Sequence, residues 1–292
     1  MPKSIAIMTC PTEQYFLLMS DVHFDNPKCD RNLLRKHLDE AVKRDAKVLI
    51  NGDLFCVMQG LTDKRHSKGD ILPQHLGPNY FDLILEDATA FFKPYAKHIA
   101  LVGYGNHETS VTKRGEHDIL QNFVYRMKHE HGADIHLGGY GGWIVIRQWT
   151  QETNTPVTKN LIVKYYHGSG GGGAVTKGTI GNQRRMASVQ GADVIWTGHV
   201  HELHHHLDMA EQLVSVRGHG DSDLYEISHK QVHHVTTAGY KEEYGDGSGG
   251  YHIEKGRPPK PLGSYWMHSV IYRKQVDNQR NYYRDVTFTM AL

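Results

Sequence analysis

Four short motifs contain the residue types that bind metal ions and act on phosphate esters. The motifs are Asp21-Val22-His23, Gly52-Asp53, Gly105-Asn106-His107-Glu108 and Gly198-His199-Val200-His201, and His167 stands alone before the last of them. Carboxylate, amide and imidazole groups together suit manganese, iron, zinc or nickel better than calcium. A pair of such ions activates water and polarises a phosphoryl group, so these residues predict hydrolysis of a phosphate ester.

Apolar runs that are typical of β-strands precede the first three motifs. These runs cover residues 15–19, 47–50 and 98–102. A polar residue directly after such a run lies at the carboxyl edge of a sheet, where open α/β folds hold their ligands. With 22 histidines in the chain, an isolated Asp-x-His is expected by chance, and Asp134-Ile135-His136 is a second example. The Gly-Asn-His-Glu motif and the order of the four motifs carry more information.

The remaining pattern predicts an α/β (α+β) fold. Helices are expected at 30–45, 80–93 and 116–130, and later strands at 143–149, 161–166, 193–197, 203–207, 212–217, 224–236, 265–274 and 282–290. Alternating strand and helix units followed by consecutive strands indicate two mixed β-sheets packed together, with helices outside. We expect a single domain over residues 1–292, which the Gly/Pro-rich segment and C-terminal strands of 239–292 close.

Composition indicates a soluble, cytoplasmic protein that does not bind membranes. The 33 basic and 32 acidic side chains nearly balance, so the chain has no overall positive potential that would attract nucleic acid or anionic lipid. Three cysteines without CxxC spacing predict neither a disulfide framework nor a zinc ribbon. We find no signal segment, no apolar run of membrane-spanning length and no indication of an oligomeric state.

The ordered motifs resemble the calcineurin-like metallophosphoesterase superfamily, whose pattern is D-x-H, GD, GNH[DE], H and GHxH. The resemblance covers about residues 15–208. It implies a four-layer sandwich and two divalent metal ions, with manganese favoured and iron, zinc or nickel as alternatives. By this resemblance the first ion binds Asp21, His23 and His201, the second binds Asn106, His167 and His199, and Asp53 bridges them. It also implies that His107 is catalytic, either contacting the phosphoryl oxygen or protonating the leaving group.

One position departs from the family pattern. The family often has GDxxD, whose last carboxylate orients the catalytic histidine, whereas this chain has Cys56 there. A thiol is a poor substitute for that carboxylate, which disfavours a protein phosphatase and favours diesters. The segment Gly52-Asp53-Leu54-Phe55 is similar to the SbcD-type nuclease branch.

Three functions follow as hypotheses. The leading one is a phosphoesterase that hydrolyses phosphate esters, diesters favoured, with a metal-activated water. The first alternative is a DNA or RNA nuclease, for which nucleic acid would be the partner. The second alternative is a metal-binding interaction module without catalysis, although such proteins typically lack ligands that this chain retains.

Several other residues admit a functional and a structural interpretation. Basic residues at 64–66, 68, 113–114 and 184–185 could guide an anionic polymer or form solvated loops. The glycines of 168–173 could approach a substrate phosphate or form a plain loop. Tyr251, Tyr265 and Trp266 could stack on a base, but packing is the favoured interpretation. We interpret the histidines at 204–206, 219 and 233–234 as surface residues.

Overall fold

The computed structural model describes residues 3–57, 68–150, 157–171, 178–215, 225–245, 247–248, 251–254, 256–276 and 279–292. The strands are β1 (Lys3–Cys10), β2 (Glu13–Met19), β3 (Lys47–Asn51), β4 (Ile99–Gly103), β5 (His136–Thr150), β6 (Val157–Tyr166), β7 (Val194–Thr197), β8 (His204–Ser215), β9 (Tyr225–Thr236), β10 (Ser264–Val276) and β11 (Gln279–Ala291). The α-helices are α1 (Arg31–Lys43), α2 (Tyr80–Phe92), α3 (Asn106–Gly115), α4 (Ile119–His131), α5 (Thr179–Met186) and α6 (Tyr251–Glu254). Short 3₁₀ turns lie at Lys68–Asp70, Pro73–His75 and Lys93–Tyr95.

The strands form one large mixed sheet, flanked by helices. Their order is β11-β10-β2-β3-β4-β5-β6-β7-β9-β8, and β1 pairs with β5 beside this path. Strand β5 connects the two halves, because His136 and Leu137 pair with β4 whereas residues 141–150 pair with β6. The two sheets expected from the sequence are therefore joined through hydrogen bonds. Strands β2, β3 and β4 run parallel and are buried along most of their length, as their continuous apolar runs predicted.

Two hydrophobic cores lie on opposite faces of β2, β3 and β4. Leu17 and Met19 belong to the core that packs against α1, α2 and α4, whereas the alternating Phe16 and Leu18 belong to the other core. This division follows from the alternation of side chains along a strand. The second core contains residues from both halves of the sheet, namely Leu49 and Leu101 with Ile144, Ile146, Val163, Val194 and Trp196.

The predicted helices are present with shifted ends. Helix α1 begins after Asp30, whose Oδ1 accepts hydrogen bonds from the backbone N–H groups of Asn32 and Leu33. Helix α2 ends at Phe92, before Pro94, and the helix expected at 116–130 corresponds to α4. One expectation was wrong, because runs 203–207 and 212–217 form one strand, β8. Four elements, β1, α3, α5 and α6, were not predicted.

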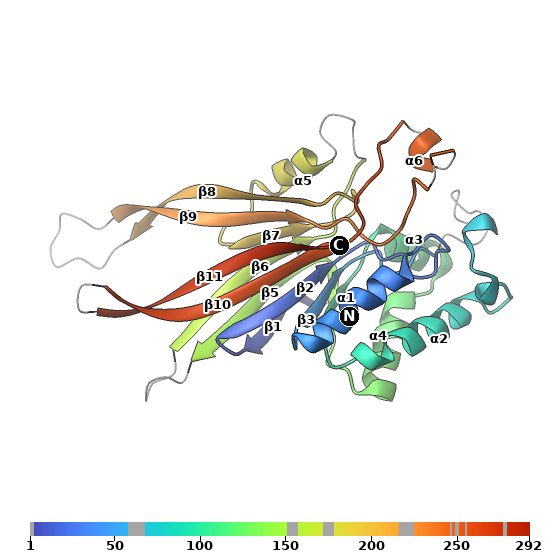
Figure 1. The fold of residues 1–292 in the computed structure, drawn as a ribbon, viewed down its shortest axis with the longest axis horizontal. Helices are drawn as coiled ribbons and strands as arrows, with labels where there is room; N and C mark the ends of the chain where they lie inside the picture. The colour runs from blue at the N-terminus through green and yellow to red at the C-terminus, as the bar shows by residue number, and fades with distance from the viewer. Residues whose placement is uncertain are drawn as a thin grey trace.

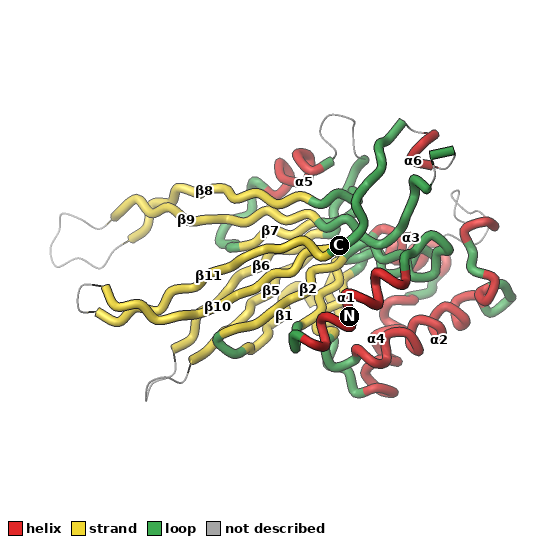
Figure 2. Tube along the Cα trace, in the orientation of Figure 1, coloured by secondary structure: helices red, strands yellow, loops and turns green. Residues whose placement is uncertain are grey.

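The loops that follow the central strands lie together at one end of the sheet (Figure 2). Helices α1, α2 and α4 lie beside this end, while hairpins β8–β9 and β10–β11 extend away from it (Figure 1). Among the helices described, none is long and apolar enough to cross a membrane.

Candidate metal centre

The four motifs lie at neighbouring strand ends. Asp21 and His23 follow β2, Asp53 follows β3, Asn106 and His107 begin α3 after β4, His167 follows β6, and His199 and His201 follow β7. Strands β2, β3 and β4 are mutually parallel, and β6 is parallel to β7. All of these side chains meet at one edge of the sheet. The preceding apolar runs predicted this position for the first three motifs.

The side chains form two groups whose ligand atoms are close together. The first group is Asp21, His23 and His201, and the second is Asp53, His167 and His199. Within each group the ligand atoms lie within 4.8 Å of one another. The groups adjoin, because His167 Nε2 lies 3.2 Å from Asp53 Oδ2 and 3.9 Å from Asp21 Oδ1. These buried clusters could hold metal ions.

Backbone N–H groups hold one oxygen of each carboxylate and leave the other directed at the imidazoles. The N–H of His199 donates to Asp21 Oδ2 at 2.8 Å, and the N–H of His107 donates to Asp53 Oδ1 at 3.0 Å. Within the described part of the chain, Asp21 Oδ1 and both ring nitrogens of His23 are buried without a hydrogen-bond partner. An unsatisfied buried polar group costs about 1–3 kcal/mol, so several together indicate a ligand from outside the chain.

Asn106 completes the second group. Its Oδ1 lies 2.7 Å from His199 Nδ1 and 3.3 Å from His167 Nε2. His199 Nε2 is 2.9 Å from the carbonyl of Gly170 and must donate to it, so Nδ1 carries a lone pair in the neutral ring. Two acceptor atoms at 2.7 Å repel unless a proton or a cation lies beside both.

In His167, as in His199, one ring nitrogen contacts a backbone carbonyl and the other faces the ligand atoms. His167 Nδ1 lies 2.7 Å from the carbonyl of Asn51, which fixes Nδ1 as the donor and directs Nε2 at the carboxylates. Burial lowers the pKa of His167, but the Asp53 and Asp21 carboxylates outweigh burial and raise this pKa to about 10. Burial likewise raises the pKa of Asp53, but His167 and His107 bring it well below its usual range. The carboxylates thus favour a positive charge where the ligand atoms converge.

The backbone is strained at five of these residues. Eight non-glycine residues in the described chain have positive φ, and five of them are Asp21 (52°), His23 (50°), Asp53 (50°), His199 (70°) and His201 (53°). Such conformations cost on the order of 1–3 kcal/mol each and cluster at functional sites. The strain concentrates on the predicted ligands.

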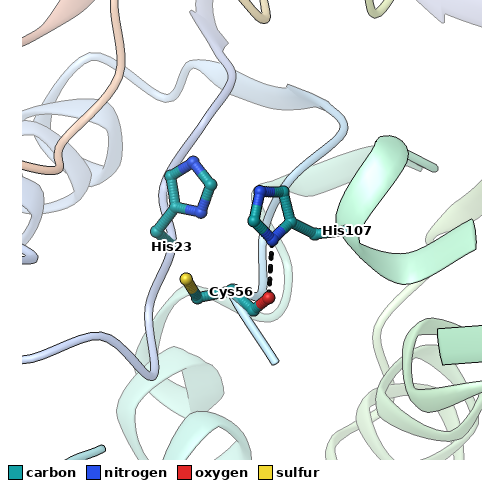
Figure 3. A group of neighbouring side chains, drawn as sticks. All are labelled: His23, Cys56 and His107. Carbon is teal, nitrogen blue, oxygen red and sulfur yellow. Dashed lines mark hydrogen bonds between the residues drawn. The ribbon is translucent and has the colours of Figure 1, made fainter. Parts of the chain in front are cut away.

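His107 lies beside His23, and a backbone carbonyl orients its ring (Figure 3). Its Nδ1 is 2.6 Å from the carbonyl oxygen of Cys56, so Nδ1 donates the hydrogen bond. The sequence predicted that the Cys56 thiol is a poor substitute for an orienting carboxylate, and in the structure the main-chain carbonyl of Cys56 contacts the ring. Burial raises the pKa of the thiol far above its usual range, with Asp25 as the next cause. The thiol nevertheless lies with His23 and His107 in a third possible metal-binding group.

Two carboxylates without a predicted role shape the loop at 53–57. Asp25 accepts from the N–H groups of Cys56 at 2.5 Å and Val57 at 2.8 Å. Glu108 accepts from the N–H groups of Asp53, Phe55 and Gly105 at 3.2, 3.0 and 2.8 Å. Burial and the neighbouring Asp53 raise the pKa of Glu108 to about 8. Glu108 belongs to the Gly-Asn-His-Glu motif, and Asp25 lies two residues after His23, so both had a sequence signal.

The C-terminal segment contacts the same edge. The N–H of Tyr240 donates to the Asp21 carbonyl at 3.1 Å, and Gly239 has a φ of +112° that favours glycine. Lys241 Nζ lies 2.8 Å from Glu243 Oε1, and Glu243 Oε2 lies 3.9 Å from His201 Nδ1. A largely buried ion pair therefore lies beside the first group.

The other candidates divide into packing residues and residues near the site. Tyr265 and Trp266 are buried in the two cores, which confirms the packing interpretation. Arg185 donates to the Ser169 carbonyl at 2.6 Å, beside Gly170. The basic residues 64–66, the glycines 172 and 173, His219 and the side chain of Tyr251 lie outside the described residues.

Comparisons with known proteins identify no family for this chain. No protein family matches the chain, and no curated protein matches it. A search of solved structures found Vacuolar Protein Sorting 29 from Cryptosporidium parvum, with 13% sequence identity, a TM-score of 0.36 and coverage of 95% of this chain and 100% of that chain. A likeness at this level carries no argument about this chain.

Proposed function

We propose that this protein is a calcineurin-like metallophosphoesterase that hydrolyses phosphate esters, with diesters favoured. One observation carries the proposal: acceptor atoms of seven side chains converge in two adjoining groups, and Asp21 Oδ1 and both ring nitrogens of His23 have no hydrogen-bond partner among the described residues. Asp21, His23 and His201 would hold one divalent ion, Asn106, His167 and His199 a second, and Asp53 both. We further propose that residues 1–292 form one domain of four-layer type.

The donor set suits borderline divalent ions. Imidazoles, carboxylates and one amide oxygen fit manganese, iron, zinc or nickel, and manganese is the favoured ion. When bound, such a pair supplies an activated water and polarises the phosphoryl oxygen. Backbone N–H groups and the Asn51 and Gly170 carbonyls hold the ligand side chains in orientations that leave their metal-binding atoms directed inward.

His107 is placed to transfer a proton. The Cys56 carbonyl holds the proton on Nδ1, so Nε2 is the atom that exchanges a proton or donates to a phosphoryl oxygen. His107 Nε2 lies 3.9 Å from Asp53 Oδ2, beside the second group. This arrangement supports protonation of the leaving oxygen by His107, with the ring orientation set by a carbonyl that needs no side-chain carboxylate.

A nuclease is the second candidate. The Gly-Asp-Leu-Phe segment favours it, as do Arg184 and Arg185 on α5, since Arg185 lies beside the loop that contacts His199. Cationic side chains near a phosphodiester site suit a polymeric substrate.

One panel tests these alternatives. The purified protein with manganese is assayed on p-nitrophenyl phosphate, bis-p-nitrophenyl phosphate, and single- and double-stranded DNA. Faster turnover of the diester supports the leading proposal, and cleavage of DNA supports the nuclease. Binding of the metal without turnover of any of the four substrates would contradict both and favour an interaction module.

A further inference from the structure

A second histidine cluster lies on hairpin β8–β9, separate from the residues of the candidate metal centre. His206 on β8 pairs directly with His234 on β9, and Asp208 lies two residues after His206 on the same face. The imidazole rings are stacked with centroids 4.6 Å apart and planes inclined by 17°. The sequence indicated only surface histidines here, because the cross-strand register that joins 206 to 234 is not visible in it.

Both histidines direct a ring nitrogen at the same carboxylate oxygen. His206 Nε2 and His234 Nε2 each lie 3.3 Å from Asp208 Oδ2. The three ligand atoms lie within 4.8 Å of one another. Tetrahedral zinc with bonds of about 2.0–2.1 Å has neighbouring ligand atoms about 3.3–3.4 Å apart, so the nitrogen–oxygen distances suit a single ion.

A neutral imidazole is the form that binds metals, and burial favours this form at His234. Burial lowers the pKa of His234, and the neighbouring His206 lowers it further. His204 Nε2 lies 3.2 Å from His206 Nδ1, and the amide nitrogen of Gln183 on α5 lies 3.0 Å from His206 Nε2, a hydrogen bond that the ion would replace. Asp208 is 60% exposed, which leaves solvent access to the cluster.

We propose that His206, Asp208 and His234 form a metal-binding site for a borderline transition ion such as zinc, nickel or copper(II). Two imidazoles and one carboxylate are a ligand set that these ions prefer, and the affinity order among divalent ions favours copper, then nickel and zinc, over manganese. For zinc, a water molecule would complete a tetrahedral shell. The ion links β8 to β9 near α5.

The hairpin contains a matched control. His229 on β9 lies 3.7 Å from Glu211 on β8, and both side chains are more than half exposed. This pair also joins a histidine to a carboxylate across the hairpin, but it has only one imidazole. A simple histidine–carboxylate contact should not hold zinc at micromolar concentration.

Zinc titration by calorimetry, with elemental analysis after dialysis, tests the site. We compare the wild type, the double variant His206→Ala with His234→Ala, and the control His229→Ala. The wild type and the control should bind one more zinc ion per chain than the double variant. This difference does not depend on the occupancy of the candidate metal centre, so failure of the proposed function would leave it intact. Equal zinc stoichiometry in all three proteins would overturn the site.

A conservative variant guards against misfolding of the hairpin. Asp208→Asn keeps the size of the side chain but removes the charged ligand, and it should weaken zinc binding by at least about 10-fold. Circular dichroism should be unchanged in every variant. Manganese-dependent hydrolysis should also be unchanged, because none of these residues belongs to the candidate metal centre. Unaltered zinc affinity in Asp208→Asn, together with equal stoichiometry in the double variant, would leave only a hydrogen-bonded surface cluster.

Discussion

Replacing Asp25 by Asn should uncouple His107 from the reaction while the metal centre stays filled. Asp25 accepts two backbone hydrogen bonds from Cys56 and Val57, and it thereby positions the carbonyl that orients His107. Asparagine keeps one acceptor oxygen and places an amide N–H group at the other position. One charge-assisted hydrogen bond, about 1.5–3 kcal/mol, is then lost from the loop.

The expected size follows from that energy. If the loss favours loop conformations in which the Cys56 carbonyl no longer contacts Nδ1, the fraction of competent enzyme falls by about 10–100-fold, because about 1.4 kcal/mol corresponds to a factor of ten. We therefore expect kcat to fall by about 10–100-fold on a diester with a poor leaving group, such as an alkyl or phenyl ester. Metal content should remain that of the wild type, since Asp25 belongs to neither ligand group.

Cys56→Ser is the matched control. It changes the side chain but keeps the carbonyl, so its kcat and metal content should be close to those of the wild type. The assay is steady-state kinetics on paired diesters with good and poor leaving groups, with elemental analysis of each protein. A loss in Cys56→Ser as large as that in Asp25→Asn would refute the reasoning, because the thiol itself would then be needed.

Three further predictions address the metal centre. Asp53→Asn should lose activity and most bound metal together, whereas His229→Ala should lose neither; elemental analysis that finds two ions retained in Asp53→Asn would exclude a bridging role. His107→Asn should keep its metal while kcat falls by about 10²–10⁴-fold, with a smaller loss for p-nitrophenyl esters, and equal losses for good and poor leaving groups would indicate contact with the phosphoryl oxygen instead. For the metal-free protein, the pKa of His167 is raised from 6.5 to about 10, so its contribution to the free energy of unfolding is fully present below pH 6.5 and is lost as the pH rises toward 10. The melting temperature of chelator-treated protein should therefore fall between pH 8 and 10. The pKa of Glu108 is raised from 4.5 to about 8, so its own contribution to stability is lost below this pH range. Metal-loaded protein should show a smaller fall, because the ion replaces the proton, and identical slopes in both would contradict this assignment.

The sequence by itself determined which residues converge at the edge of the sheet. Asp21, Asp53 and Asn106 each follow an apolar run, and a buried parallel strand ending in a polar residue has few alternative placements. The local pattern also predicted helices α1, α2 and α4, since a cap or a proline and an apolar stripe are properties of consecutive residues. The division of these ligands into two groups came from the resemblance to the metallophosphoesterase pattern and stays a prediction.

Tertiary structure alone decided how the site is held. The orientation of His107 depends on a carbonyl of residue 56, and every residue has a carbonyl, so no side chain marks that contact. The contact of Asp25 with the loop at 53–57 joins segments about thirty residues apart. His199 has a positive φ, and its backbone N–H donates to Asp21, which is 178 residues away in the sequence.

The same distinction applies to the hairpin β8–β9. Each strand contains surface histidines that the sequence shows plainly, but the cluster exists only because the antiparallel register sets His206 opposite His234. A shift of one residue would turn one of these side chains to the other face. Register is determined by hydrogen bonds and packing between distant segments. The sequence could therefore identify the types of ligand residue here, but not that His206 and His234 lie opposite each other.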